Sequence, residues 1–311
     1  MGEVKAVIDI GSNSIKLRVG RFRRGRIEVL LDSTEVVRLG RGLEGGRLRE
    51  ETLRNGVRVV EEMVRRARDR GADPRLVGTM ALRIAENAQD FLDAILDRTG
   101  LEATVLSGEE EARLAWKGAV AGRDCGGAFA VFDTGGGSTE FIFGSSSGIE
   151  RSESVAVGAV SLSERFFAED PVSEASLHEA LGYVRDLFFC SKIEWGRSLV
   201  SPTVIGLGGG LVAMASVRLG RPVFVPLRLD GMRLSRENVE EQVRRYAGCT
   251  LDERRRIVGL PASRADLVLG SACIVRCAME ALHVDSLIVG INGLRHGLLV
   301  ELFEADGFVL R

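Results

Sequence analysis

VIDIGSNSIKLRVG (7–20) and AFAVFDTGGGSTEFIFG (128–144) follow one pattern: an apolar run, an aspartate, a turn of glycine and small polar residues, and a second apolar run. Asp9 and Asp133 occupy the same place in the two copies, and a glycine follows each of them two residues later. Neither turn opens a helix and no Gly-Lys-Ser/Thr follows, so neither is a dinucleotide fingerprint or a Walker loop. A repeat more than a hundred residues apart predicts two similar α/β domains that face each other.

Periodicity predicts the elements around the two copies. Helical spacing of apolar residues predicts a helix over 50–70 that ends at Gly71, and Ser107 with Glu110 forms a capping-box pattern that starts a helix at 107. A weaker strand–glycine–helix pattern appears in TVIGLGGGLVAMASV (203–217). The further expected strands are 4–10, 15–22, 26–31, 75–79 and 286–290, and the further expected helices are 87–98, 235–247, 266–282 and 294–304.

The stretch GRDCGG (122–127) is the best candidate for a linker. We therefore expect an N-terminal domain over 1–124 and a C-terminal domain over 125–297, with 298–311 packing back on the first. The length of 311 residues agrees with two domains of ordinary size.

Composition excludes several classes of protein. Forty-two basic and 44 acidic residues give a net charge of −2, which argues against a nucleic-acid-binding protein but leaves room for a local basic cleft that binds an anion. The five cysteines are odd in number and form no C-x-x-C pair, so we expect a reduced interior, with Cys273 and Cys277 as small core residues. No signal peptide, membrane partner or membrane span is expected, which predicts a cytoplasmic protein.

The two aspartate-led turns are suited to phosphate. Glycines let backbone N–H groups converge on an anion, and the hydroxyls of Ser12, Ser14, Ser138 and Thr139 can add donors. An aspartate at the end of each first strand can hold a hydrated divalent cation, which prefers oxygen ligands. A plain hairpin turn would explain one copy, but two copies and a third glycine loop favour phosphate binding.

Other charged residues give weaker signals. Glu110 is explained by the capping box, whereas Glu111 lies on the apolar face of the expected helix, where a general base can be placed. Glu140 is either a strand-edge acid or a group that binds metal or orients water. For Arg83, a solvated surface position competes with a phosphate clamp. Surface roles are expected for Arg21, Arg23, Arg24 and Arg26 at a hairpin tip, with a polyanion track as the alternative, and for the runs 244–245 and 254–256.

Taken together, these motifs resemble the exopolyphosphatase/guanosine pentaphosphate phosphatase (Ppx/GppA) family. The matching segments cover nearly the whole chain, and SGEEEAR (107–113) followed by DTGGGSTE (133–140) is the most specific of them. The resemblance implies two RNase H-like domains of the actin and sugar-kinase type, with an active-site cleft between them. It also implies the short, two-domain form of the family.

The resemblance assigns roles to individual residues. It implies that Glu111 is the general base and that Asp133 and Glu140 orient water and bind Mg²⁺. Asp9 is a further candidate metal ligand because of its place at the end of the first strand. It also implies that Arg83 clamps phosphate, with Asn87 in the same motif. The implied phosphate-binding residues are Asp9, Gly11, Ser12, Asn13 and Ser14 in the first loop, Gly135, Gly136, Gly137, Ser138 and Thr139 in the second, and Gly208, Gly209 and Gly210 in the third.

Two motifs depart from the family pattern. The third loop usually carries threonines, whereas here it is GGGLVAMA (208–215), so phosphate contact there would come from backbone N–H groups. The C-terminal motif VGINGLRHG (289–297) has Gly290 at the usual serine and His296 at the usual glutamate. These changes affect the expected specificity more than the expected chemistry.

The function expected from sequence is Mg²⁺-dependent release of terminal orthophosphate from inorganic polyphosphate. The alternatives are 5′-phosphohydrolysis of guanosine pentaphosphate (pppGpp), an ATP-dependent kinase or ATPase of the same superfamily, and a non-catalytic polyphosphate or alarmone sensor. A monovalent cation such as K⁺ is a candidate second cofactor, and a homodimer is a candidate assembly.

Overall fold

The computed structural model describes residues 2–41, 43, 46–123, 127–145, 147–191, 203–221 and 228–309. The chain divides into two compact units: Met1–Asp124 together with Asn292–Arg311, and Cys125–Ile291. The chain therefore returns from the second unit to the first between Ile291 and Asn292. This boundary lies earlier in the chain than the one expected from the sequence, after residue 297. Within the linker expected at 122–127, residues 124–126, including Cys125, lie outside the described residues.

The first unit is built on a five-stranded sheet with the order β3-β2-β1-β4-β5. β1, β2 and β3 are antiparallel neighbours, whereas β1, β4 and β5 run parallel. The strands are β1 (Val4–Ile10), β2 (Ser14–Arg23), β3 (Arg26–Val36), β4 (Pro74–Gly78) and β5 (Ala103–Val105). β3 is longer than the expected strand 26–31, because its polar second half pairs with the start of β2.

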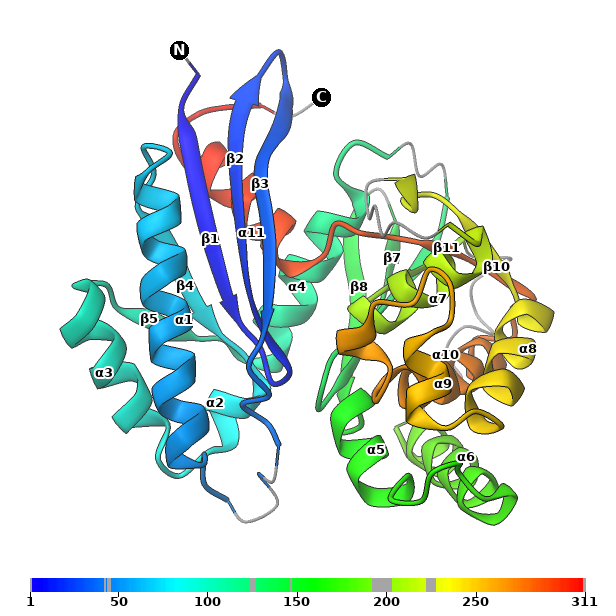
Figure 1. Cartoon of the computed structure of the whole chain (residues 1–311). Coiled ribbons are helices and arrows are strands. Elements are labelled where there is room, and N and C mark those ends of the chain that lie inside the picture. The colour runs from blue at the N-terminus through cyan, green and yellow to red at the C-terminus, as the bar shows by residue number, and fades with distance from the viewer. Residues whose placement is uncertain are drawn as a thin grey trace. The chain divides into compact units, whose positions relative to one another are not determined.

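Helices cover both faces of this sheet, because side chains of β1 alternate between two apolar clusters. Ile8 and Ile10 lie in the cluster on the α1 face, and Val7 lies in the cluster formed with α4 and α11. Figure 1 shows α1 and α3 on one side of the strands and α11 on the other. The helices of this unit are α1 (Glu50–Arg68), α2 (Met80–Ile84), α3 (Ala88–Thr99), α4 (Gly108–Val120) and α11 (Leu294–Ala305).

The second unit repeats the same sheet and adds one edge strand, in the order β10-β11-β9-β6-β7-β8. β6, β7 and β8 are antiparallel neighbours, and β6, β9 and β11 run parallel. The strands are β6 (Phe129–Thr134), β7 (Thr139–Ser145), β8 (Gly148–Val155), β9 (Thr203–Leu207), β10 (Arg233–Ser235) and β11 (Ser286–Val289). Three antiparallel strands followed by two parallel ones are present in both units, as expected for two RNase H-like domains.

The helices of the second unit build its main core. They are α5 (Ala159–Phe166), α6 (Glu174–Cys190), α7 (Gly209–Leu219), α8 (Arg236–Ala247), α9 (Leu251–Arg255) and α10 (Val268–Ala281). Phe132, Phe141 and Phe188 fill this core, and the rings of Phe141 and Phe188 meet edge to face at 5.0 Å. Four elements of this unit, α5, α6, β8 and β10, were not expected from the sequence.

Cys273 and Cys277 are buried core residues, as expected. Burial raises the pKa of both thiols, that of Cys277 to about 12. Both are therefore held as thiols at neutral pH. Among the described helices, none combines the length and the apolar character needed to cross a bilayer.

Candidate functional site: two phosphate-type loops and their carboxylates

The turn between β1 and β2 is closed by its own hydrogen bond, which Gly11 N donates to Ser14 O at 3.1 Å. A neighbouring segment holds the turn from outside, since Gly40 N donates to Ser12 O at 2.7 Å and Arg38 N to Asn13 O at 2.8 Å. Within the described part of the chain, no hydrogen bond uses the N–H groups of Ser12 and Asn13. These two donors are therefore available to an anion.

The turn between β6 and β7 has the same construction. Gly135 N donates to Ser138 O at 2.9 Å, and Val160 N donates to Gly136 O at 2.7 Å. A Cβ on Gly158 would overlap the backbone of Gly136, so only glycine fits where α5 approaches the turn. Among the described residues, no hydrogen bond uses the N–H groups of Gly136 and Gly137. The repeat seen in the sequence is thus a repeat of turn geometry.

The hydroxyls of the two turns are not equivalent. Thr139 Oγ1 donates to Val157 O at 2.7 Å, and the side chain is fully buried. This hydroxyl therefore holds the turn in place instead of facing an anion, in contrast to the role expected from the sequence. Ser12, Ser14 and Ser138 are also buried in their units.

The predicted carboxylates lie at the ends of strands. Asp133 and Glu140 are paired directly across β6 and β7, so both side chains project from the same face of the sheet. Glu140 is buried and accepts a hydrogen bond from Ser154 Oγ at 3.0 Å. In the first unit, Asp9 is buried and its Oδ2 lies 3.5 Å from Lys16 Nζ. Each unit therefore presents acid groups beside its own phosphate-type turn.

These groups suit a magnesium ion that is held partly by a bound phosphate. Mg²⁺ keeps several waters and is usually bound through one or two carboxylates plus substrate oxygens. In the second unit Asp133 and Glu140 supply two carboxylates, and in the first unit Asp9 supplies one. The described residues contain no group of three or more His, Cys, Asp or Glu side chains arranged as a complete metal cage. Asn13 Oδ1 adds a buried oxygen that no described donor reaches.

Arg83 and Glu111 meet in the first unit. Arg83 Nη1 donates to Leu106 O at 2.7 Å and also to Glu111 Oε1 in a short ion pair. Glu111 is only 8% exposed and lies in the first turn of α4, on the face of that helix that also buries Leu114. Arg83 therefore fixes the orientation of the predicted base.

The capping box predicted at the start of α4 is present. Glu110 N donates to Ser107 Oγ at 3.1 Å, and Ser107 N donates to Glu110 Oε2 at 2.8 Å. Asn87 has a structural role, because its side-chain amide exchanges two hydrogen bonds with the backbone of Leu48. The cap thus sets where α4 begins, and with it the position of Glu111.

Two glycines also position α4. A Cβ on Gly297 of α11 would overlap Leu114 O, and a Cβ on Gly118 would overlap Gly293 O. The backbones of α4 and α11 therefore touch, only one turn from Glu111.

For Gly297→Ala we expect the free energy of unfolding to fall by about 2 kcal/mol, because the added methyl group must push two helix backbones apart. Urea unfolding measures this change. Gly182→Ala in α6 is the matched control: nothing lies within 4 Å of a Cβ at this helical position, so the substitution should stabilise by about 0.5–1 kcal/mol. Equal effects at the two positions would show that the helix crossing tolerates the extra volume.

The third glycine loop begins α7 in the second unit. Gly208 has φ +112°, and a Cβ there would overlap Thr134 O at the end of β6. A Cβ on Gly210 would overlap the hydroxyl of Ser271. The glycines of this loop therefore allow α7 to start close to the turn between β6 and β7.

The sequence analysis missed an arginine at this loop. The guanidinium of Arg264 lies against Gly209, where a Cβ would overlap it. The signal was the segment GLPASRADLV (259–268), which matched the family pattern but was given no role. A cation at the loop is consistent with phosphate binding.

Among the arginines expected at the surface, one is buried. Arg23, Arg24 and Arg26 are exposed at the β2–β3 turn, as are residues 244, 245, 255 and 256. The expectation for Arg254 was wrong, because it is only 4% exposed. Its guanidinium is held inside the unit by Asp170 and by the backbone oxygens of Cys249 and Ala265.

His296 is buried beside a cluster of charged side chains in the first unit. Arg18 donates to Asp32 Oδ2 through Nε at 3.0 Å and to Asn292 Oδ1 through Nη1 at 2.9 Å, and Arg295 also pairs with Asp32. His296 is 7% exposed, and no described group bonds its Nδ1. Burial, with a smaller effect of the two arginines, lowers the pKa of His296 to about 4. The imidazole is therefore neutral at pH 7.

Comparison with known proteins places this arrangement in a family. The model of the Ppx/GppA phosphatase family matches residues 18–305. A guanosine-5′-triphosphate,3′-diphosphate pyrophosphatase of Pseudoalteromonas atlantica is 30% identical over 97% of this chain and 59% of its own length. The chain thus spans about three-fifths of the length of that curated relative.

Solved structures extend the likeness over whole chains. The Ppx/GppA family member of Aquifex aeolicus superposes with a TM-score of 0.81 at 27% identity, covering 97% of this chain and 98% of its own. An exopolyphosphatase-like protein superposes with a TM-score of 0.89 at 27% identity, covering 98% and 100%. With the family model matched across both units and the paired turns in place, the chain belongs to the Ppx/GppA phosphatase family.

Proposed function

We propose that this protein hydrolyses the terminal phosphoanhydride bond of a polyphosphorylated substrate. The observation that carries the proposal is the turn built twice, with Gly11 N on Ser14 O and Gly135 N on Ser138 O, and an aspartate two residues before each glycine. Each turn offers N–H donors to a phosphate, and each unit has carboxylates beside its turn.

In the proposed reaction, Glu111 takes the proton from the attacking water. Its carboxylate is held in place by the ion pair with Arg83. Within the described contacts Arg83 uses only Nη1, so Nε and Nη2 remain to bind a phosphate oxygen. Positioning and electrostatics then supply most of the rate, as in other phosphoryl transfers.

The second unit contributes the other acid groups. Asp133 and Glu140 orient water, and Gly136 and Gly137 donate backbone N–H groups to the phosphate. A magnesium ion bound through these carboxylates would neutralise charge that develops on the phosphate oxygens. The guanidinium of Arg264 adds positive charge at the third loop, where the chain lacks threonines.

Two substrates fit this chemistry. Inorganic polyphosphate is the substrate that the sequence favoured, and the name of the exopolyphosphatase-like structure agrees with it. The second candidate is pppGpp, supported by the name of the Pseudoalteromonas atlantica relative, a guanosine-5′-triphosphate,3′-diphosphate pyrophosphatase. The two differ in their products, since polyphosphate is shortened stepwise whereas pppGpp gives ppGpp and one phosphate.

The test is phosphate release by the purified protein with Mg²⁺, comparing long-chain polyphosphate, pppGpp and ATP at equal concentrations of terminal phosphate. We expect kcat/KM for polyphosphate or pppGpp to exceed that for ATP by at least about tenfold, and EDTA to abolish the activity. Preferred turnover of ATP would assign the chain to the ATPase alternative. Tight binding of polyphosphate or pppGpp without release of phosphate would support a sensor.

A further inference from the structure

Arg254 is a buried cation that the proposed reaction does not use. Its side chain donates three hydrogen bonds: Nε to Cys249 O at 3.1 Å, Nη2 to Asp170 Oδ1 at 3.2 Å, and Nη1 to Ala265 O at 3.4 Å. Burial lowers the pKa of this guanidinium, but an arginine stays charged at neutral pH. A buried charge held by three separate segments fixes those segments relative to one another.

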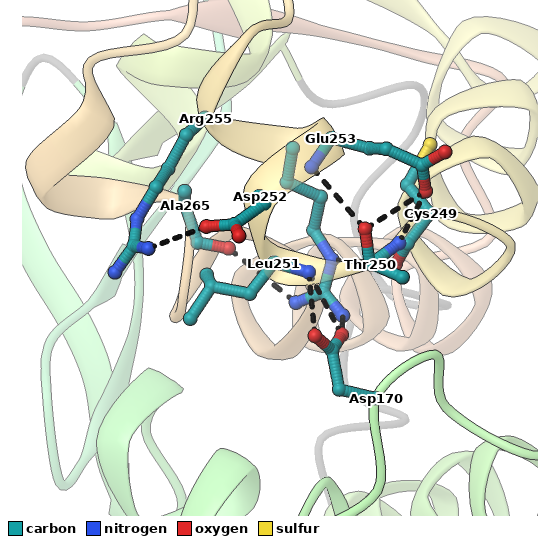
Figure 2. Close-up of polar contacts among 9 residues, drawn as sticks. Asp170, Cys249, Thr250, Leu251, Asp252, Glu253, Arg255 and Ala265 are labelled. Atoms are coloured by element: carbon teal, nitrogen blue, oxygen red, sulfur yellow. Dashed lines mark hydrogen bonds and ion pairs between the residues drawn. The ribbon is translucent and has the colours of Figure 1, made fainter.

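Asp170 completes the network. Both of its carboxylate oxygens accept the backbone N–H of Leu251 at 2.8 Å, so the acid holds the start of α9 as well as Arg254. Figure 2 shows Asp170 below α9, with its contacts to Leu251 drawn as dashed lines. Ala265 lies to the left of the Leu251–Asp170 contact in this view. The loop before α6, the start of α9 and residue 265 are therefore tied together.

Residue 265 is the point at which this network reaches the third glycine loop. The short turn Ala262–Arg264 ends one residue before it, and Arg264 lies against Gly209 at the start of α7. Gly259 contacts the other end of α7, since a Cβ there would meet Ser216 O at 2.5 Å. The segment 259–265 thus runs along α7, touching it near both ends.

We propose that the Arg254–Asp170 pair is a positioning device: it anchors Ala265 and so holds the Arg264 guanidinium beside the third glycine loop for phosphate. This inference rests on the proposed function, because it gives Arg264 a substrate phosphate to bind. Gly208, Gly209 and Gly210 have no side-chain donors, so a positioned cation matters more at this loop than it would beside threonines. Arg254 itself acts only through Arg264.

The test combines a binding measurement with a double-mutant cycle. Tripolyphosphate in EDTA is the probe, titrated calorimetrically into wild type, Arg254→Met, Arg264→Ala and the double variant. Arg255→Met is the matched control, since Arg255 is the exposed neighbour and pairs only with Asp252 among the described residues. The free energy of unfolding of each variant is measured in urea.

We expect Arg264→Ala and Arg254→Met each to weaken tripolyphosphate binding by about tenfold, and Arg255→Met by less than twofold. In the Arg264→Ala background, Arg254→Met should weaken binding by less than twofold, because the group that it positions is gone. If Arg254→Met only lowered the stability of the protein, it would weaken tripolyphosphate binding by the same factor with and without Arg264. In steady-state assays the loss should appear mainly in KM, since the proton-transfer groups are unaltered.

Arg254→Lys keeps the charge but loses the planar fork, and it carries the test if Arg254→Met does not fold. It should weaken binding severalfold, and only when Arg264 is present. The proposal is overturned if a folded Arg254 variant binds tripolyphosphate as wild type does, or if its effect is the same in both backgrounds. Binding that follows the cycle in a protein that hydrolyses nothing would uphold the positioning device and reject the hydrolase.

Discussion

Replacing Glu111 by glutamine should lower kcat for phosphate release by about 10²- to 10⁴-fold, with a much smaller change in substrate binding. Glutamine keeps the size of the side chain and an oxygen that can accept the hydrogen bond of Arg83 Nη1, but it cannot take a proton from water. The change therefore removes the proposed chemistry and leaves the geometry. Single-turnover rates and tripolyphosphate titrations, measured on the same preparation, separate the two effects.

Glu109→Gln is the matched control, because Glu109 lies in the same helical turn and is exposed. It alters the charge at the start of α4 equally, so any effect of the helix dipole or of net charge should appear in both variants. If the two variants lose activity to the same small extent, Glu111 is not the base. If Glu111→Gln loses binding as well as rate, the Arg83–Glu111 pair is needed for the phosphate site itself.

The two β-hairpins could be predicted because their signals lie in short, continuous stretches of sequence. An apolar run, an aspartate, a glycine turn and a second apolar run specify a hairpin at Ile10 and Ser14, and again at Thr134 and Thr139. The first turn of α4 could also be predicted, since the Ser107–Glu110 capping box is formed by residues close together in the chain. α5 was missed because it spans only eight residues, and α6 because its apolar and polar residues are weakly separated around the helix; both pack against α10.

The contacts within the candidate site could not be predicted, because they join residues distant in sequence. Nothing local says that the Thr139 hydroxyl bonds Val157 O, 18 residues later in the chain. The burial of Arg254 depends on Asp170, 84 residues earlier in the chain. A polar residue in a motif thus carries two competing roles, one toward a ligand and one inside the fold, and only tertiary structure decides between them.

His296 should make the protein lose stability as the pH falls from about 6.5 to about 4. In the folded state burial, assisted by Arg18 and Arg295 and opposed by Asp32, lowers its pKa to about 4, whereas an unfolded chain has the ordinary value near 6.5. The unfolded chain therefore binds the proton first, so the stabilisation is complete above pH 6.5 and is lost on the way down to pH 4. A lowering of this size corresponds to about 3 kcal/mol.

Asp32 affects the stability of the protein over a separate, lower pH range. The arginines hold its pKa below the ordinary 3.8 against the opposing effect of burial, so its contribution is lost only below about pH 3.8. The loss between pH 6.5 and 4 can therefore be assigned to His296 by removing that group alone. Urea unfolding of wild type and His296→Gln at pH 7, 6, 5 and 4 gives the two stability curves.

We expect the wild-type curve to fall more steeply than that of His296→Gln by up to about 3 kcal/mol over this range, whatever the variant loses at pH 7 through altered packing. His178→Gln, at an exposed position on α6, is the control and should keep the wild-type slope. Parallel curves for wild type and His296→Gln would mean that the buried imidazole takes up its proton without cost. In that case, the cluster of Arg18, Asp32 and Arg295 would have to rearrange to receive a third positive charge.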